Sequence, residues 1–305
     1  MSRTPAGRTP AGRTVAGRTP AGLTVVRAGP LTTVQDLGRP GHAHLGVPRS
    51  GAADRSALRR ANRMAGNPEG AAGLETTLLG VTVRLGEARW LAAAGAEAEV
   101  TVDGEPVRSP FRAGAGATVT VGRARRGLRS YLAVGGGIAV PPTLGSRSTD
   151  RLSGLGPDPL RDGETLPLGP PTEPGDPAAD PALPAEPVLR LRPGPRDDWF
   201  AGTGPLAAGP YQVQTDSDRV GLRLAGPELT RTRTAELPSE GLVPGAVQVP
   251  ADGRPVLFLA DHPTTGGYPV IGVVHPGDLW LAAQARPGAR LRFRLVPGHT
   301  DHAVE

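Results

Sequence analysis

Short stretches in which apolar and polar residues alternate recur along the chain, and they predict a protein built mainly of β-strands. Alternation with a period of two places the apolar side chains on one face of a strand. The stretches are VTVRL (81–85), VTV (100–102), TVTV (118–121), LRL (189–191) and LRFRL (291–295). Dipeptides typical of turns punctuate the pattern, and they are Asp103-Gly104, Asp252-Gly253 and Pro287-Gly288.

One segment has a helical pattern instead. Asp54 suits an N-cap, and Gly66 with Pro68 ends the segment. Its apolar residues fall on one face, and they are Ala57, Leu58, Ala61 and Met64. The remaining elements are short strands joined by Gly and Pro, which favours barrels or sandwiches over a βαβ sheet. We therefore expect two β-barrel-like domains with few short helices.

Proline and glycine divide the chain. Residues 3–22 repeat the unit Arg-Thr-Pro-Ala-Gly four times with one departure, Val15, and we expect a disordered tail there. The segment GPPTEPGDPAADPALPAEP (169–187) predicts a linker. The predicted organisation is a tail at 1–22, a β domain at 23–168, the linker, a β-barrel at 188–298 and a tail at 299–305.

The composition excludes several functions. Four of the 34 basic residues lie in the repeat, and the rest of the chain carries 30 basic and 29 acidic residues, so the high pI of 10.7 does not indicate a nucleic-acid binder. The chain contains neither Cys nor Lys, which excludes disulfides, a Walker lysine and covalently attached biotin. We expect no metal and, because no apolar run is long enough for a membrane span, a soluble cytoplasmic protein.

The richest candidate for chemistry is DHPTTGGYP (261–269), which follows the apolar run VLFLA (256–260). A buried strand that ends in a polar loop is a common way to hold binding or catalytic groups. Asp261 and His262 supply an acid and an imidazole, followed by hydroxyls, a Gly pair and a phenol. These are Thr264, Thr265, Gly266, Gly267 and Tyr268.

Three other polar clusters are candidates. Arg39 and Arg49 lie in a Gly-rich region able to bind a carboxylate or phosphate. The second cluster, residues 135–137 with Ser146, Arg147 and Ser148, outlines an anion pocket, although three glycines also suit a tight bend. In the third, Glu240 is a candidate acid or base and Gln248 a ligand for an amide, although a polar strand edge also accounts for both.

Together the clusters resemble the biotin-dependent carboxyltransferase family, also called allophanate hydrolase subunit 2, whose members include KipA and the 5-oxoprolinase subunit PxpC. The resemblance covers about residues 23–298. It rests on TTVQDLGR (32–39), GVPRSGAAD (46–54), LETTL (74–78), SYLAVGGGI (130–138), GSRST (145–149), GAVQVP (245–250) and TTGGY (264–268). The chain departs from the family at His262-Pro263, where the family usually has a charged or polar pair.

The resemblance implies a cyclophilin-like β-barrel fold and the role of C subunit in an ATP-dependent 5-oxoprolinase, which opens 5-oxoproline to L-glutamate. The partners would be a PxpA-like protein as the A subunit, together with a KipI/PxpB-like protein as the B subunit, with ATP used by the complex. Two alternatives are half of a biotin-dependent carboxyltransferase of the urea carboxylase type and a KipA-like regulatory protein.

For the lactam reaction we expect three roles. Asp261, Glu240 or His262 would act in catalysis, Arg39 or Arg147 would hold the substrate carboxylate, and Gln248 would hold the lactam amide. The remaining predicted substrate-binding residues are Ser146, Ser148, Thr264, Thr265, Gly266, Gly267 and Tyr268. The backbones at 135–137 and 266–267 would stabilise developing negative charge.

Overall fold

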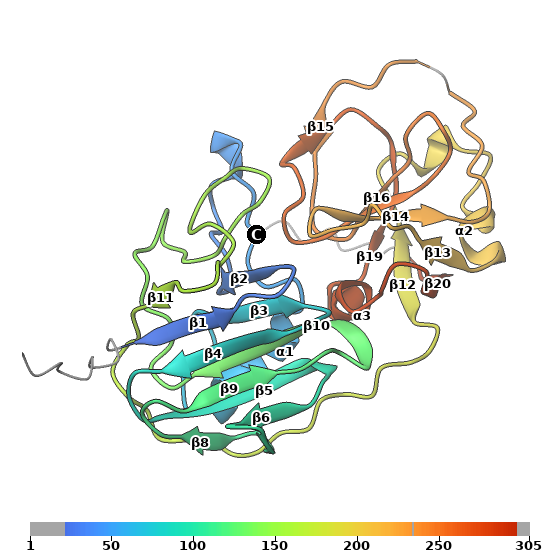
Figure 1. Ribbon diagram of the computed structural model, residues 1–305. Helices are drawn as coiled ribbons and strands as arrows, with labels where there is room; N and C mark the ends of the chain where they lie inside the picture. Colours follow the sequence, from blue (N-terminus) through green and yellow to red (C-terminus); the bar gives the residue numbers. More distant parts are fainter. Residues whose placement is uncertain (1–21, 234, 298–305) are drawn as a thin grey trace, which may run out of the picture.

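The computed structural model describes residues 22–233 and 235–297 (Figure 1). The predicted tails at 1–22, apart from Gly22, and at 299–305 lie outside the described residues. Within the described part, the protein is mainly β with few short helices, as the alternating pattern predicted. None of the described helices is long and apolar enough to cross a bilayer.

The first half contains two antiparallel sheets that share one core. Its strands are β1 (Leu23–Arg27), β2 (Thr32–Gln35), β3 (Gly73–Thr77), β4 (Val81–Leu85), β5 (Arg89–Glu97), β6 (Val100–Val102), β7 (Glu105–Pro106), β8 (Phe111–Ala113), β9 (Thr118–Val121), β10 (Arg126–Val134) and β11 (Thr165–Leu166). One sheet has the order β11-β1-β4-β9-β6-β7 and the other β2-β3-β10-β5-β8. Apolar side chains from both meet between them, among them Leu23, Val83, Val119, Leu74, Leu91 and Leu132. This burial is the main stabilising term for the half.

The predicted helix forms as α1 (Arg55–Met64). Asp54 caps it, because its carboxylate accepts a hydrogen bond of 2.9 Å from the Ala57 backbone N–H. The predicted apolar face is buried against the outer face of β5 and β10, where it meets Ala92, Ala94 and Ala133. A short 3₁₀ turn, η1 (Ala43–Leu45), precedes the helix.

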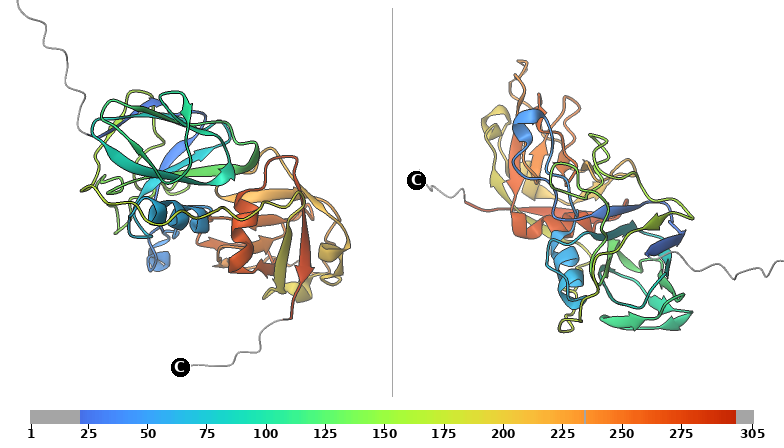
Figure 2. Two further views of the ribbon diagram at one scale, coloured as in Figure 1. Left: turned by 90° about the horizontal axis from the view of Figure 1, so that it is seen from below. Right: turned by 90° about the vertical axis from the view of Figure 1, so that its left-hand side faces the viewer.

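The Pro-rich segment 169–187 runs along the outside of the first half (Figure 2, left). The Thr172 hydroxyl donates to the Ala65 carbonyl at 2.8 Å, and the Gly175 N–H donates to the Met64 carbonyl at 3.0 Å. Further along, Asp180 pairs with Arg60. The segment is thus extended, as its composition suggested, but it is also bonded to α1.

The second half is a closed barrel. Its strands are β12 (Val188–Pro193), β13 (Tyr211–Val213), β14 (Gly221–Ala225), β16 (Ala246–Gln248), β17 (Val256–Phe258), β19 (Val270–Val274) and β20 (Arg290–Leu295). They follow the order β12-β19-β16-β17-β14-β13-β20, and the parallel pair β12 and β20 closes the ring. Closure removes the exposed sheet edges that would otherwise invite aggregation.

Short elements complete the barrel domain. They are η2 (Asp197–Trp199), α2 (Gly204–Ala208), η3 (Pro276–Asp278), α3 (Leu279–Ala283) and the paired strands β15 (Glu240–Gly241) and β18 (Thr265–Gly266). In Figure 1, α3 lies at the bottom of the barrel domain beside β10 of the first half, and β15 lies at the top of that domain, away from α3. The turn dipeptides lie where the sequence predicted: Asp103-Gly104 joins β6 to β7, and Asp252-Gly253 joins β16 to β17.

Candidate functional site

The structure brings together two of the clusters that the sequence analysis treated separately. β15 pairs with β18, so that Glu240 lies opposite Gly266 and Gly241 lies opposite Thr265. The Gln248 side-chain amide donates a hydrogen bond of 2.9 Å to the Tyr268 carbonyl. Glu240, Gln248 and the 264–268 loop therefore form one group on the barrel domain.

Within this group, exposure and charge differ among the residues. Tyr268 is 48% exposed, and Thr265 and Gly267 are also exposed, so these residues are accessible to a ligand or partner. Arg196 forms a bidentate ion pair with Glu240. The hydrogen bonds from Arg196 hold the pKa of the Glu240 carboxyl below its ordinary value. Glu240 is therefore ionised at neutral pH and suits a hydrogen-bond acceptor rather than a proton donor, and the lowered pKa makes the carboxylate a weaker base.

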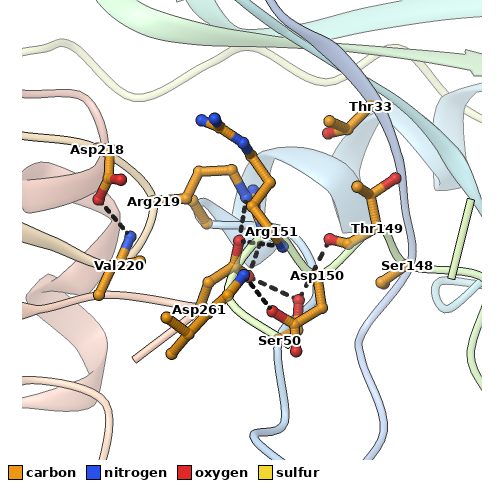
Figure 3. A network of polar contacts seen from close by, with 12 residues as sticks. Thr33, Ser50, Ser148, Thr149, Asp150, Arg151, Asp218, Arg219, Val220 and Asp261 are labelled. Atoms are coloured by element: carbon orange, nitrogen blue, oxygen red, sulfur yellow. Dashed lines mark hydrogen bonds and ion pairs between the residues drawn. The ribbon is translucent and has the colours of Figure 1, made fainter. Parts of the chain in front are cut away.

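Asp261 occupies a different environment from the rest of its loop. Its side chain is fully buried, and Arg219 binds both of its oxygens, with Nε–Oδ2 at 2.8 Å and Nη2–Oδ1 at 2.9 Å. The Ser50 hydroxyl, from the first half, donates to Oδ1 at 2.6 Å. Figure 3 shows these three side chains side by side. Arg219 and Asp261 thus form a buried ion pair within the barrel domain, and the Ser50 hydroxyl joins it to the first half. This geometry does not test whether Asp261 also acts in catalysis.

The same arginine reaches a second carboxylate. Arg219 also forms a buried ion pair with Glu75 and donates to the Gly51 carbonyl at 2.7 Å. The Tyr131 hydroxyl donates to Glu75 at 2.7 Å. Burial favours the protonated form of Glu75, but the cations Arg219 and Arg129 outweigh it and lower the pKa of this carboxyl. The network is therefore charged and fully internal.

His262 is also buried, with 4% of its surface exposed. Its Nδ1 lies 2.7 Å from the Pro263 carbonyl, which can only accept, so Nδ1 carries the proton. Burial lowers the pKa of the imidazole below 6.5, although Asp261 and Asp150 act in the opposite direction. The ring is therefore neutral at pH 7, with its lone pair on Nε2.

The predicted anion pocket around Ser146 and Ser148 is organised around another carboxylate. Both hydroxyls donate to Oδ1 of Asp36 at 2.6 Å, and the Arg147 backbone N–H donates to Oδ2 at 2.6 Å. Asp36 is itself buried. An internal carboxylate therefore occupies these donors, and the loop is held in place by charge-assisted hydrogen bonds.

The two arginines predicted to hold a carboxylate are also engaged. Arg39 is 1% exposed, and its Nη2 donates to the Ser148 carbonyl at 2.5 Å. Arg147 is half-buried and donates from Nε to the Val140 carbonyl at 2.7 Å. In this structure both arginines support the loop at 140–150.

The glycine triplet at 135–137 is a packing feature. Its three backbone N–H groups donate to the Trp90 carbonyl, the Asn67 side chain and the Val134 carbonyl. A Cβ on Gly136 would lie 2.3 Å from the Pro170 carbonyl oxygen, and its φ is 94°. The triplet therefore permits close approach of the Pro-rich segment, which is the tight-bend interpretation.

Sequence reasoning missed the members of the ion-pair network other than Asp261. Ser50 and Glu75 lie within segments that carried the family resemblance, GVPRSGAAD and LETTL, so the resemblance was a signal for both. Arg219 follows Asp218 in an unremarkable polar loop, and nothing local distinguishes it from the other arginines. Its role is visible only when both halves are in place.

Comparison with known proteins agrees with the fold. The model of the carboxyltransferase domain, subdomain A and B, matches residues 45–295. The chain is 40% identical over 288 residues to the C subunit of 5-oxoprolinase from Escherichia coli strain K12, covering 89% of this chain and 90% of that protein.

Two solved structures are similar. The protein TTHA0988 superposes with a TM-score of 0.82 at 39% identity, covering 90% of this chain but only 55% of that chain. The urea carboxylase of Kluyveromyces lactis superposes with a TM-score of 0.87 at 28% identity, covering 93% of this chain and 28% of that chain. The chain therefore belongs to the family of the carboxyltransferase domain, subdomains A and B.

Proposed function

We propose that this chain is the C subunit of an ATP-dependent 5-oxoprolinase, a complex that opens 5-oxoproline to L-glutamate. The observation that carries the proposal is the 40% identity to a protein named as the C subunit of 5-oxoprolinase, because the match extends over about nine-tenths of both chains. The activity belongs to the complex rather than to this chain alone.

The chemistry of the reaction sets what the site must do. A lactam carbonyl is a poor electrophile, so ring opening requires activation at the carbonyl oxygen. ATP would transfer its terminal phosphoryl group to that oxygen and leave as ADP. Attack of water then breaks the C–N bond to give an acyl phosphate, and a second water releases phosphate. The protein must also bind the substrate carboxylate and stabilise developing negative charge. These tasks call for cations, backbone N–H groups and a base.

The group formed by Glu240, Gln248 and the 264–268 loop supports a part of this work. Glu240 is ionised and fixed by Arg196, which suits a group that accepts a hydrogen bond from substrate or water. Thr265 and Tyr268 are exposed beside it and can contact substrate or another protein of the complex. Asp261 and His262 are buried, and we assign them the role of holding the 264–268 loop in position.

The remaining functions come from partners. The chain has no Lys and no P-loop, so we propose that ATP binds mainly to a partner protein. The partners are a KipI/PxpB-like protein, as the B subunit, and a PxpA-like protein, as the A subunit. A complete active site then forms only in the hetero-oligomer.

The test is to purify the chain together with both candidate partners and to measure glutamate formed from 5-oxoproline with and without ATP. The proposal predicts ATP-dependent glutamate release by the complex. Its absence from a folded, assembled complex would refute the proposal.

One observation favours a second candidate, half of a biotin-dependent carboxyltransferase. The chain superposes on the urea carboxylase of Kluyveromyces lactis with a TM-score of 0.87. It spans only 28% of that protein and has no Lys to carry biotin, so the carboxylase and the biotin carrier would have to be separate chains. Carboxylation of urea that depends on both bicarbonate and ATP, by the chain together with a biotin carboxylase and a biotin-carrying partner, would favour this candidate.

A further inference from the structure

A cavity of about 660 Å³ lies between the two halves of the molecule. One wall is the loop before α1 together with the first turns of that helix. The other wall comes from the barrel domain, namely the residues after β15, the end of β17, and α3. Its volume falls in the range of small-molecule sites, and sites of this kind often lie between domains.

Three arginines supply the charge on the first wall: Arg49, Arg55 and Arg59. Of these, only Arg59 forms an ion pair within the described residues, 3.5 Å from Glu69 at the surface. No Asp or Glu is among the described residues that line the cavity. Within the described residues, Arg49 and Arg55 therefore have no ion-pair partner, although the charge of Asp36 acts on Arg55 from outside the cavity lining.

Arg55 lies close enough to Arg49 and Arg59 for the three positive charges to repel one another. Its Nη2 donates to the Leu37 and Ser50 carbonyls at 3.1 and 3.2 Å, which holds the guanidinium close to the loop. Burial and the nearby cations Arg49 and Arg59 lower the pKa of Arg55 to about 10. A bound anion would relieve this repulsion.

The opposite wall is apolar. Val243, which is 50% exposed, lines it with Leu279 and Trp280, both half-buried. An inorganic anion gains nothing from such a surface, whereas the ring or chain of an organic anion buries apolar area against it. Arginines facing an apolar wall thus select a small organic anion.

A hydrogen bond from Ser50 joins the two walls. This residue has φ of 52°, a left-handed conformation that is uncommon for a residue other than Gly, and its hydroxyl donates to Asp261 of the barrel domain. This hydrogen bond therefore anchors the loop that carries Arg49 to the barrel domain. Ser50 acts as a positioning residue.

We propose that this interdomain cavity binds a small cyclic carboxylate, with Arg49 and Arg55 binding the carboxylate and the wall of Leu279 and Trp280 covering the ring. The inference rests on the proposed function for the identity of the ligand, 5-oxoproline. Of the anion-binding candidates named from the sequence, Arg49 lines this cavity, whereas Arg39, Arg147 and the residues of the 264–268 loop do not. The site is thus distinct from the exposed loop at 264–268.

Isothermal titration calorimetry of the isolated full chain with 5-oxoproline tests the proposal. Saturable binding is expected, with 2-pyrrolidinone, the same ring without the carboxylate, binding roughly tenfold to a hundredfold more weakly because charge-assisted hydrogen bonds are lost. Absence of binding by 5-oxoproline, equal binding of the two compounds, or tighter binding of ATP at the same arginines would overturn it.

Two variants test the location. Arg49→Gln removes one cation, and Val243→Asp introduces a carboxylate on the opposite wall; both residues are exposed, so both variants should fold. Each should weaken binding of 5-oxoproline at least tenfold. Arg63→Gln is the matched control for the loss of a cation, because Arg63 is exposed on α1, pairs with Glu69 and does not line the cavity. Equal affinity of Arg49→Gln and Arg63→Gln would place the ligand elsewhere.

This binding is measured without partner proteins or ATP, which separates the inference from the proposed function. A complex that releases glutamate, from a chain that does not bind 5-oxoproline, would refute the cavity and leave the function standing. Binding by the chain without turnover by the assembled complex would support the cavity and refute the function.

Discussion

The buried pairing of Arg219 with two carboxylates gives a strong prediction about stability. Arg219 is 1% exposed, and its partners Asp261 and Glu75 are 0% and 1% exposed at the side chain. Arg219→Met keeps much of the side-chain volume but leaves both carboxylates without their shared cation. Removing one partner of a buried ion pair costs about 3 to 5 kcal/mol, since the remaining charge is desolvated and uncompensated.

Urea unfolding monitored by tryptophan fluorescence measures this loss. Trp90 reports on the first half and Trp199 and Trp280 on the barrel domain. Arg223→Met is the matched control, because Arg223 lies four residues further along and pairs with Asp216 at the surface, where the side chains are 58% and 64% exposed. An exposed pair contributes about 0 to 1 kcal/mol.

The reasoning also predicts the behaviour of a double variant. If the loss arises from uncompensated buried carboxylates, Asp261→Asn should restore part of the stability when combined with Arg219→Met, although it destabilises the protein on its own. Losses for Arg219→Met and Arg223→Met that agree within about 1 kcal/mol would refute the argument.

Three further variants probe other buried groups. The native protein should lose stability as the pH drops below about 6.5, because burial lowers the pKa of the His262 imidazole and the unfolded chain binds the proton first. His262→Gln should reduce this loss. Urea unfolding at several pH values measures it, with the exposed His44→Gln as control. Asp36→Asn should cost about 1 to 3 kcal/mol and speed hydrogen exchange at the Arg147 amide, whereas a change at exposed Asp158 should do neither. Gln284→Leu should lower the free energy of unfolding in urea by at least about 2 kcal/mol. The change removes the side-chain amide that forms hydrogen bonds with Asp54 and with the backbone of residues 128–129 across the interface. A loss below about 0.5 kcal/mol would contradict this.

The fold was largely predictable because its signals are local. Alternation marks β4 and β20, Asp103-Gly104 marks a hairpin, and Asp54 marks the start of α1, each within a few residues. What local patterns do not contain is the partner of each strand. The closure of the barrel by the parallel pair β12 and β20, about a hundred residues apart, illustrates this.

The candidate site was less predictable, for a physical reason. A sequence shows that Ser146 and Ser148 are able to bind an anion, but it does not show that Asp36, more than a hundred residues away, already accepts from both hydroxyls. Likewise, Asp261 looks like an available acid until Arg219 and Ser50 are placed around it. Polar residues that satisfy one another over long sequence separations cannot be distinguished locally from those that bind a ligand.

The central claim is that this chain is an obligatory part of a 5-oxoproline-opening complex. The most direct measurement is the initial rate of ATP-dependent glutamate release while the chain is titrated into fixed amounts of the PxpA-like and PxpB-like partners. The account predicts background rates without the chain and a rise that saturates at a fixed ratio to the PxpB-like partner. A rate that is independent of the chain, with all three proteins folded and both partners active, would contradict it.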